Sequence, residues 1–268
     1  MYRGFKLHGI DVGTFAEITG CRISDEVMRR GRMQDDASAR SIRTAVDRLA
    51  AKGDAIDGDL LEAAWFPQGD FDVFISHSHA DRNMALALSG ALQSYFGLKA
   101  FVDSCVWNCR DRLIAKIREL SGNNPMCPCM NPDDENAVIS HADMMLNCSL
   151  LRMIDSCECL MFLDTPQSIK RRNLADKTFS AWLYSEITIS KFIREIVPER
   201  RRHRHRLLNE SQTPAVEGLA QKISHGADLS HLTGLTADAF IRWARQVKAK
   251  GLSGRQTLDS LYDLMPGA

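Results

Sequence analysis

The sequence lacks a hydrophobic run long enough to cross a membrane. Nowhere in its 268 residues do about 18 apolar residues follow one another. The first residues, MYRGFKLHGIDVG, also lack the charged and then apolar layout of a secretory signal. We therefore expect a cytoplasmic protein with no membrane segment. With 44% hydrophobic residues the chain can form a core, in one domain with extensions or in two small domains.

An excess of charge of one sign is absent as well. Lys plus Arg (34) and Asp plus Glu (34) balance, so no long-range field favours nucleic acid or an anionic membrane. The basic run at residues 200–206 is more typical of a solvated helix face, and nucleic acid is only an alternative partner. No heptad array predicts an oligomeric state.

The eight cysteines include no C-x-x-C pair of the kind found in zinc ribbons. Because no signal peptide is recognisable, we expect reduced thiols that act as small, partly buried apolar residues. A structural zinc site stays an alternative, since Cys127/Cys129, Cys157/Cys159 and Cys105/Cys109 are close in sequence.

Hydrophobic periodicity divides the chain near residues 67–69, Pro-Gln-Gly. Before this point, residues 23–50 are rich in charge and in helix formers, so residues 1–69 are predicted to be a helical extension. After it, FDVFIS (71–76) and LKAFVD (98–103) are typical of buried strands, and the segment between them is typical of a helix that ends at Gly97. Strand, helix and strand with short connections predict a parallel sheet.

The same alternation continues toward the C-terminus. We expect a helix at 110–120, an insertion at 121–137, a strand at 159–164 and a helix at 179–196 with Ser180 as N-cap. The helix before residue 159 is predicted to bury Met144, Met145, Cys148, Leu151 and Ile154. A last strand is expected within 221–232, and two C-terminal helices within 236–268. The fold class is therefore α/β, with a parallel sheet flanked by helices.

The motif FISHSHADR offers two interpretations. His77, His79 and Asp81 follow a strand in an H-x-H-x-D pattern that is typical of dinuclear zinc hydrolases. However, the next residue is Arg82, no further ligands are recognisable, and Asp81 also suits the N-cap of the following helix. A metal-dependent hydrolase is thus the less favoured alternative, and we expect no bound metal.

Three segments of the chain resemble the Toll/interleukin-1 receptor (TIR) domain in order and spacing. They are FDVFISHSHAD, GLKAFVDSCVW and SAWLYSE, and the resemblance covers residues 70–196 and is nearest to bacterial members. It implies a flavodoxin-like TIR domain, here at 70–235, with a parallel sheet of about five strands flanked by helices. The segment EIVP after the last helix is short for the strand expected there.

The resemblance also implies a function, namely cleavage of NAD+ in bacterial defence against phage, by hydrolysis or cyclisation. Trp182-x-x-x-Glu186 matches the family's catalytic helix, so Glu186 is the expected catalytic carboxylate. The expected substrate-binding residues are Ser76, His77, Ser78, Asp103, Ser104, Trp107 and Trp182. NAD+ is the substrate and no cofactor is expected.

The resemblance implies self-association through TIR domains, and in some relatives a partner effector. A non-catalytic TIR scaffold is therefore the main alternative function. Each site residue also has a plainer explanation, because Glu186 can pair with the basic run and Trp182 can be a core aromatic.

Overall fold

The computed structural model describes residues 1–19, 70–102, 132–172, 175–178, 180–202 and 225–266, together with seven single positions (29, 32, 33, 36, 40, 44 and 114). A five-stranded sheet runs through its centre in the order β3-β2-β4-β1-β8. All four strand pairs are parallel. The strands are β1 (Arg3–His8), β2 (Val73–Ser76), β3 (Ala100–Val102), β4 (Cys159–Asp164) and β8 (Thr233–Thr236). The predicted α/β fold class with about five parallel strands is confirmed.

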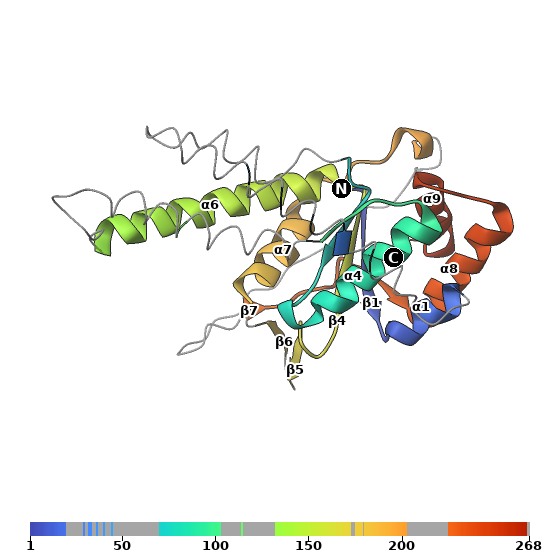
Figure 1. The fold of residues 1–268 in the computed structure, drawn as a ribbon, viewed down its shortest axis with the longest axis horizontal. Coiled ribbons are helices and arrows are strands. Elements are labelled where there is room, and N and C mark those ends of the chain that lie inside the picture. Colours follow the sequence, from blue (N-terminus) through green and yellow to red (C-terminus); the bar gives the residue numbers. More distant parts are fainter. Residues whose placement is uncertain are drawn as a thin grey trace.

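Helices cover both faces of this sheet (Figure 1). One face carries α1 (Val12–Thr19), α4 (Arg82–Ala91) with its π-helical continuation η2 (Leu92–Phe96), α8 (Ala237–Lys250) and α9 (Arg255–Leu264). The other face carries α6 (Pro132–Ser156), whose first turns extend beyond the sheet, and α7 (Ala181–Phe192). The remaining elements are short: η1 (His79–Asp81), η3 (Glu199–Arg201) and an antiparallel sheet of β5 (Lys170–Arg172), β6 (Ala175–Thr178) and β7 (His225–Gly226).

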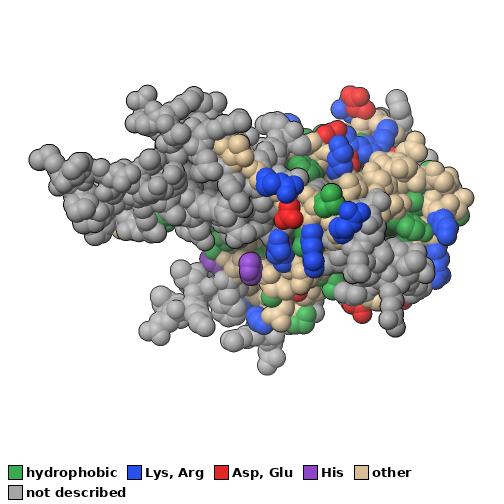
Figure 2. Space-filling view, viewed as in Figure 1, with side chains coloured by type: hydrophobic (Ala, Val, Ile, Leu, Met, Phe, Trp, Pro, Cys, Tyr) green, Lys and Arg blue, Asp and Glu red, His purple; other side chains and the backbone are tan. Residues whose placement is uncertain are grey.

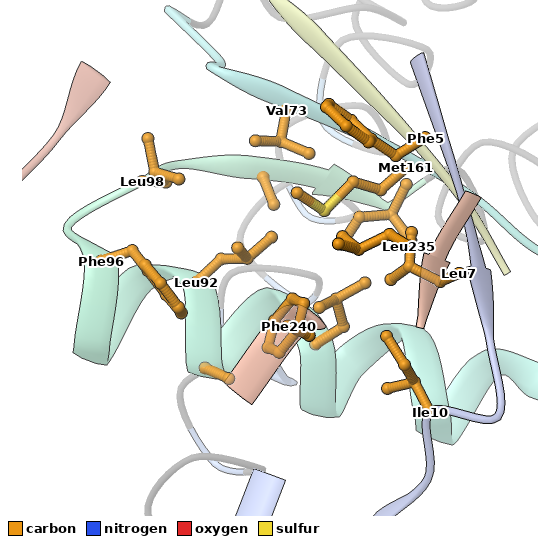
Figure 3. Close-up of a cluster of buried hydrophobic side chains, with 14 of the residues drawn as sticks. Phe5, Leu7, Ile10, Val73, Leu92, Phe96, Leu98, Met161, Leu235 and Phe240 are labelled. Carbon is orange, nitrogen blue, oxygen red and sulfur yellow. The ribbon is translucent and has the colours of Figure 1, made fainter. Parts of the chain in front are cut away.

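Strand β4 shows how the sheet divides the core. Its sequence CLMFLD is buried at every position, as expected for a strand covered on both faces. Cys159, Met161 and Leu163 point to the cluster under α4 and α8, and Leu160 and Phe162 to the cluster under α6 and α7. Figure 3 shows Met161 in the first cluster between the strands and Phe240 of α8.

The two C-terminal helices are confirmed and are anchored at the turn between α4 and β3. Gly97 ends η2 with φ of 68°, and a Cβ there would lie 2.5 Å from the Ser253 hydroxyl. The close approach therefore requires glycine as well as the left-handed conformation. Next to it, Trp243 stacks on Phe96 at 4.0 Å between ring centroids, and the Gly254 amide donates to the Phe96 carbonyl (2.8 Å).

The prediction of a helical extension at residues 1–69 is wrong for its first part. Residues 3–8 form β1, which lies between β4 and β8, and α1 packs against α4 and α8. β1 lies beside β4, and the Ile196 amide, within the segment after α7, donates to the Met1 carbonyl (2.9 Å). The N-terminus thus supplies the strand next to β4, and the segment EIVP (195–198) forms none. The helices expected at 23–50 lie mostly outside the described residues.

The expected apolar stripe of α6 is confirmed at Met145 and Ile154, which pack in or against the core, but it is wrong at its other three positions. Met144 and Leu151 are exposed by 63% and 48%, and Cys148 is exposed. Besides Ile154, the helix buries Ala142, Leu146, Leu150 and Met153. Both sets recur at helical spacing, so the sequence alone does not choose between them. The helix begins at Pro132 and therefore includes the end of the insertion expected at 121–137.

Candidate functional site

The candidate site lies at the carboxyl end of the main sheet. Strand β2 is followed in sequence by β3 on one side, whereas β4 lies on its other side. The direction of winding therefore reverses between β2 and β4, and ligands of open α/β sheets bind beyond the carboxyl ends of strands at such a point. The FISHSHAD motif leaves β2 at this place, and Thr165 leaves β4 beside it.

The central contact of the site joins β2 to α7. Ser76, the last residue of β2, is fully buried, and its hydroxyl donates a hydrogen bond to Oε2 of Glu186. Glu186 is only 1% exposed, in the middle of α7. The structure thus brings together two residues that are 110 positions apart in the sequence and that were both predicted for the site.

The local sequence explains why Glu186 points inward. Ser180 is the N-cap of α7, as predicted, and its hydroxyl accepts from the Leu183 amide (3.2 Å). Leu183 and Ile187 anchor the helix in the core, and Glu186 lies on the same side, one turn after Leu183. Trp182 is half-buried and packs against the same hydrophobic cluster. Its predicted contact with a substrate stays a prediction.

A hydroxyl network connects the loops that follow β2 and β4. The Asp81 carboxylate accepts from the hydroxyls of Ser78 (2.5 Å) and Thr165 (2.6 Å). Asp81 does occupy the N-cap position of α4, as predicted, but its side chain makes no capping hydrogen bond. The carboxylate instead holds the two loops together at the edge where the sheet reverses its winding.

The two histidines of the motif separate. His77 is buried, with Nδ1 3.4 Å from the carbonyl oxygen of Ile75, whereas His79 is exposed in η1. Within the described part of the chain no three His, Cys, Asp or Glu side chains form a group suited to a metal ion. Three further predicted residues, Asp103, Ser104 and Trp107, lie outside the described residues.

Two of the basic residues considered as partners of Glu186 form ion pairs elsewhere. Arg200 pairs with Glu158 and Asp259, and Arg201 pairs with Asp259 and Asp263. The pairs with Asp259 and Asp263 attach η3 to α9. On the face seen in Figure 2, Lys and Arg side chains are scattered among uncharged residues with Asp and Glu between them. Positions 203–206 of the basic run lie outside the described residues.

Cys157 and Cys159 are close in sequence, but their side chains lie on opposite faces of the main sheet. Cys157 packs in the cluster under α6 and α7, and Cys159 in the cluster under α4 and α8. Burial raises the pKa of the Cys157 thiol to about 12 and raises that of Cys159 further. Both therefore behave as small hydrophobic residues and are poor ligands or nucleophiles.

Sequence reasoning missed two polar pairs on the α7 side of the sheet. His8 at the end of β1 contacts Asp164 at the end of β4, with 2.6 Å between Nδ1 and Oδ2. Ser190 of α7 contacts Nε2 of His231 (2.9 Å). The first pair had a signal, because RGFKLH alternates apolar Phe5 and Leu7 with other residues, as a strand does.

Comparisons with protein-family models, curated proteins and solved structures found no match for this chain. Among the helices that the structure describes, none has the length and apolar character needed to span a bilayer.

Proposed function

We propose that this chain is a TIR-type enzyme that cleaves NAD+ into nicotinamide and an ADP-ribose product. The observation that carries the proposal is the buried contact between the Ser76 hydroxyl and the Glu186 carboxylate at the carboxyl end of β2. The carboxylate belongs to the Trp-x-x-x-Glu segment that the family resemblance marks as catalytic, and the hydroxyl ends the strand that opens the resemblance.

The chemistry requires a fixed negative charge. When the bond between the nicotinamide nitrogen and C1′ of ribose breaks, its electron pair leaves with nicotinamide and positive charge develops on the sugar. A carboxylate held beside the ribose stabilises this charge, and more strongly where water is excluded. In this proposal Glu186 supplies the charge, and the hydrogen bond from Ser76 fixes the orientation of its carboxylate.

The loops at the same edge are suited to bind the rest of the dinucleotide. Ser78 and Thr165 are held by Asp81, so the ends of β2 and β4 form one connected rim. A rim that is already ordered lowers the entropic cost of binding. Trp182 and the predicted residues Asp103, Ser104 and Trp107 complete the proposed substrate site. We place the enzyme in the bacterial cytoplasm, in defence against phage, with activity that depends on self-association and with an effector protein as a further partner.

The test is nicotinamide release from NAD+ by the purified protein at low and high concentration. Glu186→Gln keeps the shape of the side chain and removes its charge, so we expect release to fall by about 100-fold or more. Glu195→Gln is the matched control, because Glu195 follows α7 and is exposed. Release by the wild type and the control, but not by Glu186→Gln, supports the proposal.

Two other outcomes point elsewhere. Equal release by the wild type and Glu186→Gln would remove Glu186 from the mechanism. No release by the wild type at any concentration would favour the alternative function, a TIR scaffold that acts by assembly, which sedimentation of the same samples would detect.

A further inference from the structure

The His8–Asp164 pair stands at the same edge of the sheet as the proposed active site. His8 and Asp164 are the last residues of β1 and β4 and are register partners. Nδ1 of His8 lies 2.6 Å from Oδ2 of Asp164, whose side chain is 2% exposed, whereas the His8 side chain is 33% exposed. The pair therefore joins a buried carboxylate to an imidazole that solvent can reach.

The pair lies on the same face of the sheet as Glu186. Phe74 and Phe162 belong to the cluster under α7, and side chains two residues apart in a strand share a face. Ser76 and Asp164 each follow one of these residues by two positions. Because Ser76 is the register partner of Phe162, the Cα atoms of Ser76 and Asp164 are about 8 Å apart, given usual strand spacings.

The contact of the Asp164 carboxylate with Nδ1 determines which nitrogen of His8 is basic. A carboxylate at Nδ1 holds the proton there and leaves the lone pair on Nε2. It also stabilises the imidazolium that forms when Nε2 takes up a second proton. Gly234 lies next to the Nε2 side of the ring. A Cβ added at this glycine would lie 3.7 Å from Nε2.

We propose that His8 is the general base that activates the attacking water, with Asp164 as its positioning residue. This inference rests on the proposed NAD+ cleavage. The water oxygen forms a bond to C1′ of the ribose while the bond from C1′ to the nicotinamide nitrogen breaks. The electron pair of that bond leaves with neutral nicotinamide. The water proton passes to Nε2 of His8 and then to solvent.

The roles of the two buried carboxylates are thus different. Glu186 stabilises the sugar cation directly, whereas Asp164 acts through His8. A base placed for water favours hydrolysis over attack by the adenine ring. ADP-ribose is therefore the expected main product, and a cyclic main product from the wild type would overturn the inference without the need for any variant.

The decisive variant is His8→Asn. The asparagine amide can still donate to Asp164 from near the position of Nδ1, but it has no basic atom in place of Nε2. We expect kcat for nicotinamide release to fall about 100-fold with little change in KM, since general-base catalysis contributes on the order of 100-fold or more. Asp164→Asn, which weakens the orientation of His8, should lower kcat less and also leave KM nearly unchanged.

Added azide distinguishes a general base from a structural residue at position 8. Azide attacks C1′ without losing a proton, so it needs no general base. Added azide should restore nicotinamide release by His8→Asn and give an ADP-ribosyl azide, while Glu186→Gln should stay inactive. Circular dichroism of each variant checks its fold.

Failure of this inference can be distinguished from failure of the proposed function. If Glu186→Gln abolishes release but His8→Asn matches the wild type, the general base is refuted and the NAD+ cleavage stands. If His8→Asn is slow and azide does not restore it, the role of His8 as a base is refuted. If the wild type releases no nicotinamide, both proposals fall together.

Discussion

The two faces of the main sheet are both buried, but they are built from different side chains. The face under α4, α8 and α9 is filled by hydrophobic residues, with Phe96, Phe240 and Trp243 in mutual contact. The face under α7 is hydrophobic in the middle, at Phe74 and Phe162. Toward the carboxyl ends of its strands it buries the polar residues Ser76, Asp164 and Glu186.

This difference distinguishes buried polar residues that stabilise the fold from those that belong to the candidate site. Three carboxylates are buried among the described residues, namely Asp72, Asp164 and Glu186. Asp72 has a structural role at the opposite edge of the sheet, where it accepts from Arg255 (2.6 Å) and from the Lys99 amide (2.9 Å). The other two lie where ligands bind in open α/β folds. Burying a carboxylate costs several kcal/mol, and functional sites commonly accept such a cost.

The largest predicted effect is the loss of a hydrophobic side chain under α4, α8 and α9. Trp243 is fully buried, stacks on Phe96 and donates from Nε1 to the Thr257 carbonyl (2.7 Å). Trp243→Ala should lower the free energy of unfolding by about 3–5 kcal/mol, as large-to-small core substitutions do. Glu186→Gln should change it by less than about 1 kcal/mol. Urea denaturation followed by circular dichroism measures both free energies. A similar loss of stability in the two variants would show that Glu186 contributes as much to the fold as Trp243 does.

A second prediction compares neighbouring leucines of α6. Leu150 is 5% exposed and packs under α7, whereas Leu151 is 48% exposed. Leu150→Ala should lower the free energy of unfolding by about 2–4 kcal/mol, and Leu151→Ala by no more than about 0.5 kcal/mol. Both residues are leucines in the same helix, so each variant is the control for the other. A larger loss at Leu151 would restore the stripe predicted from the sequence.

The α6 example shows where sequence patterns lose information about the fold. Strand β4 was predicted with its exact bounds, because a short run such as CLMFLD between helical segments fits few structures other than a buried strand. Helix α6 was predicted to exist, but it carries apolar residues on more than one face. The choice of face depends on contacts with α7 and the sheet, which are distant in sequence.

The candidate site was predictable to a similar extent. Ser76, Ser78 and Glu186 could be predicted as candidates because each lies in a local motif, at a strand end or on a helix. His8 was missed because β1 has only two buried apolar residues in alternation, Phe5 and Leu7, and lies far from its partner strand in the sequence. The pairing of His8 with Asp164 is a property of sheet order, which local patterns do not contain.

A third prediction concerns the buried polar residues under α7. Ser76→Ala removes the hydroxyl that donates to buried Glu186, and loss of such a donor costs about 1–3 kcal/mol. In the Glu186→Gln background the same substitution should cost less, because a neutral amide needs the donor less than a carboxylate does. Unfolding of the two single variants and the double variant gives their coupling energy. Additive losses would show that the contact does not stabilise the carboxylate.

The smallest predicted effect is a pH dependence at the other polar contact under α7. Burial lowers the pKa of His231 from its usual 6.5 to about 4, opposed by the charge of Asp228 and assisted by that of Lys191. As pH falls from about 7 to about 5, the unfolded chain therefore takes up a proton that folded His231 does not, and stability decreases. Because the imidazole is partly exposed, the loss should be only about 1 kcal/mol. His231→Asn should remove this part of the pH dependence in urea denaturation at each pH. A free energy of unfolding that increased as the pH fell would contradict this prediction, because it would mean that folded His231 takes up a proton more readily than the unfolded chain does.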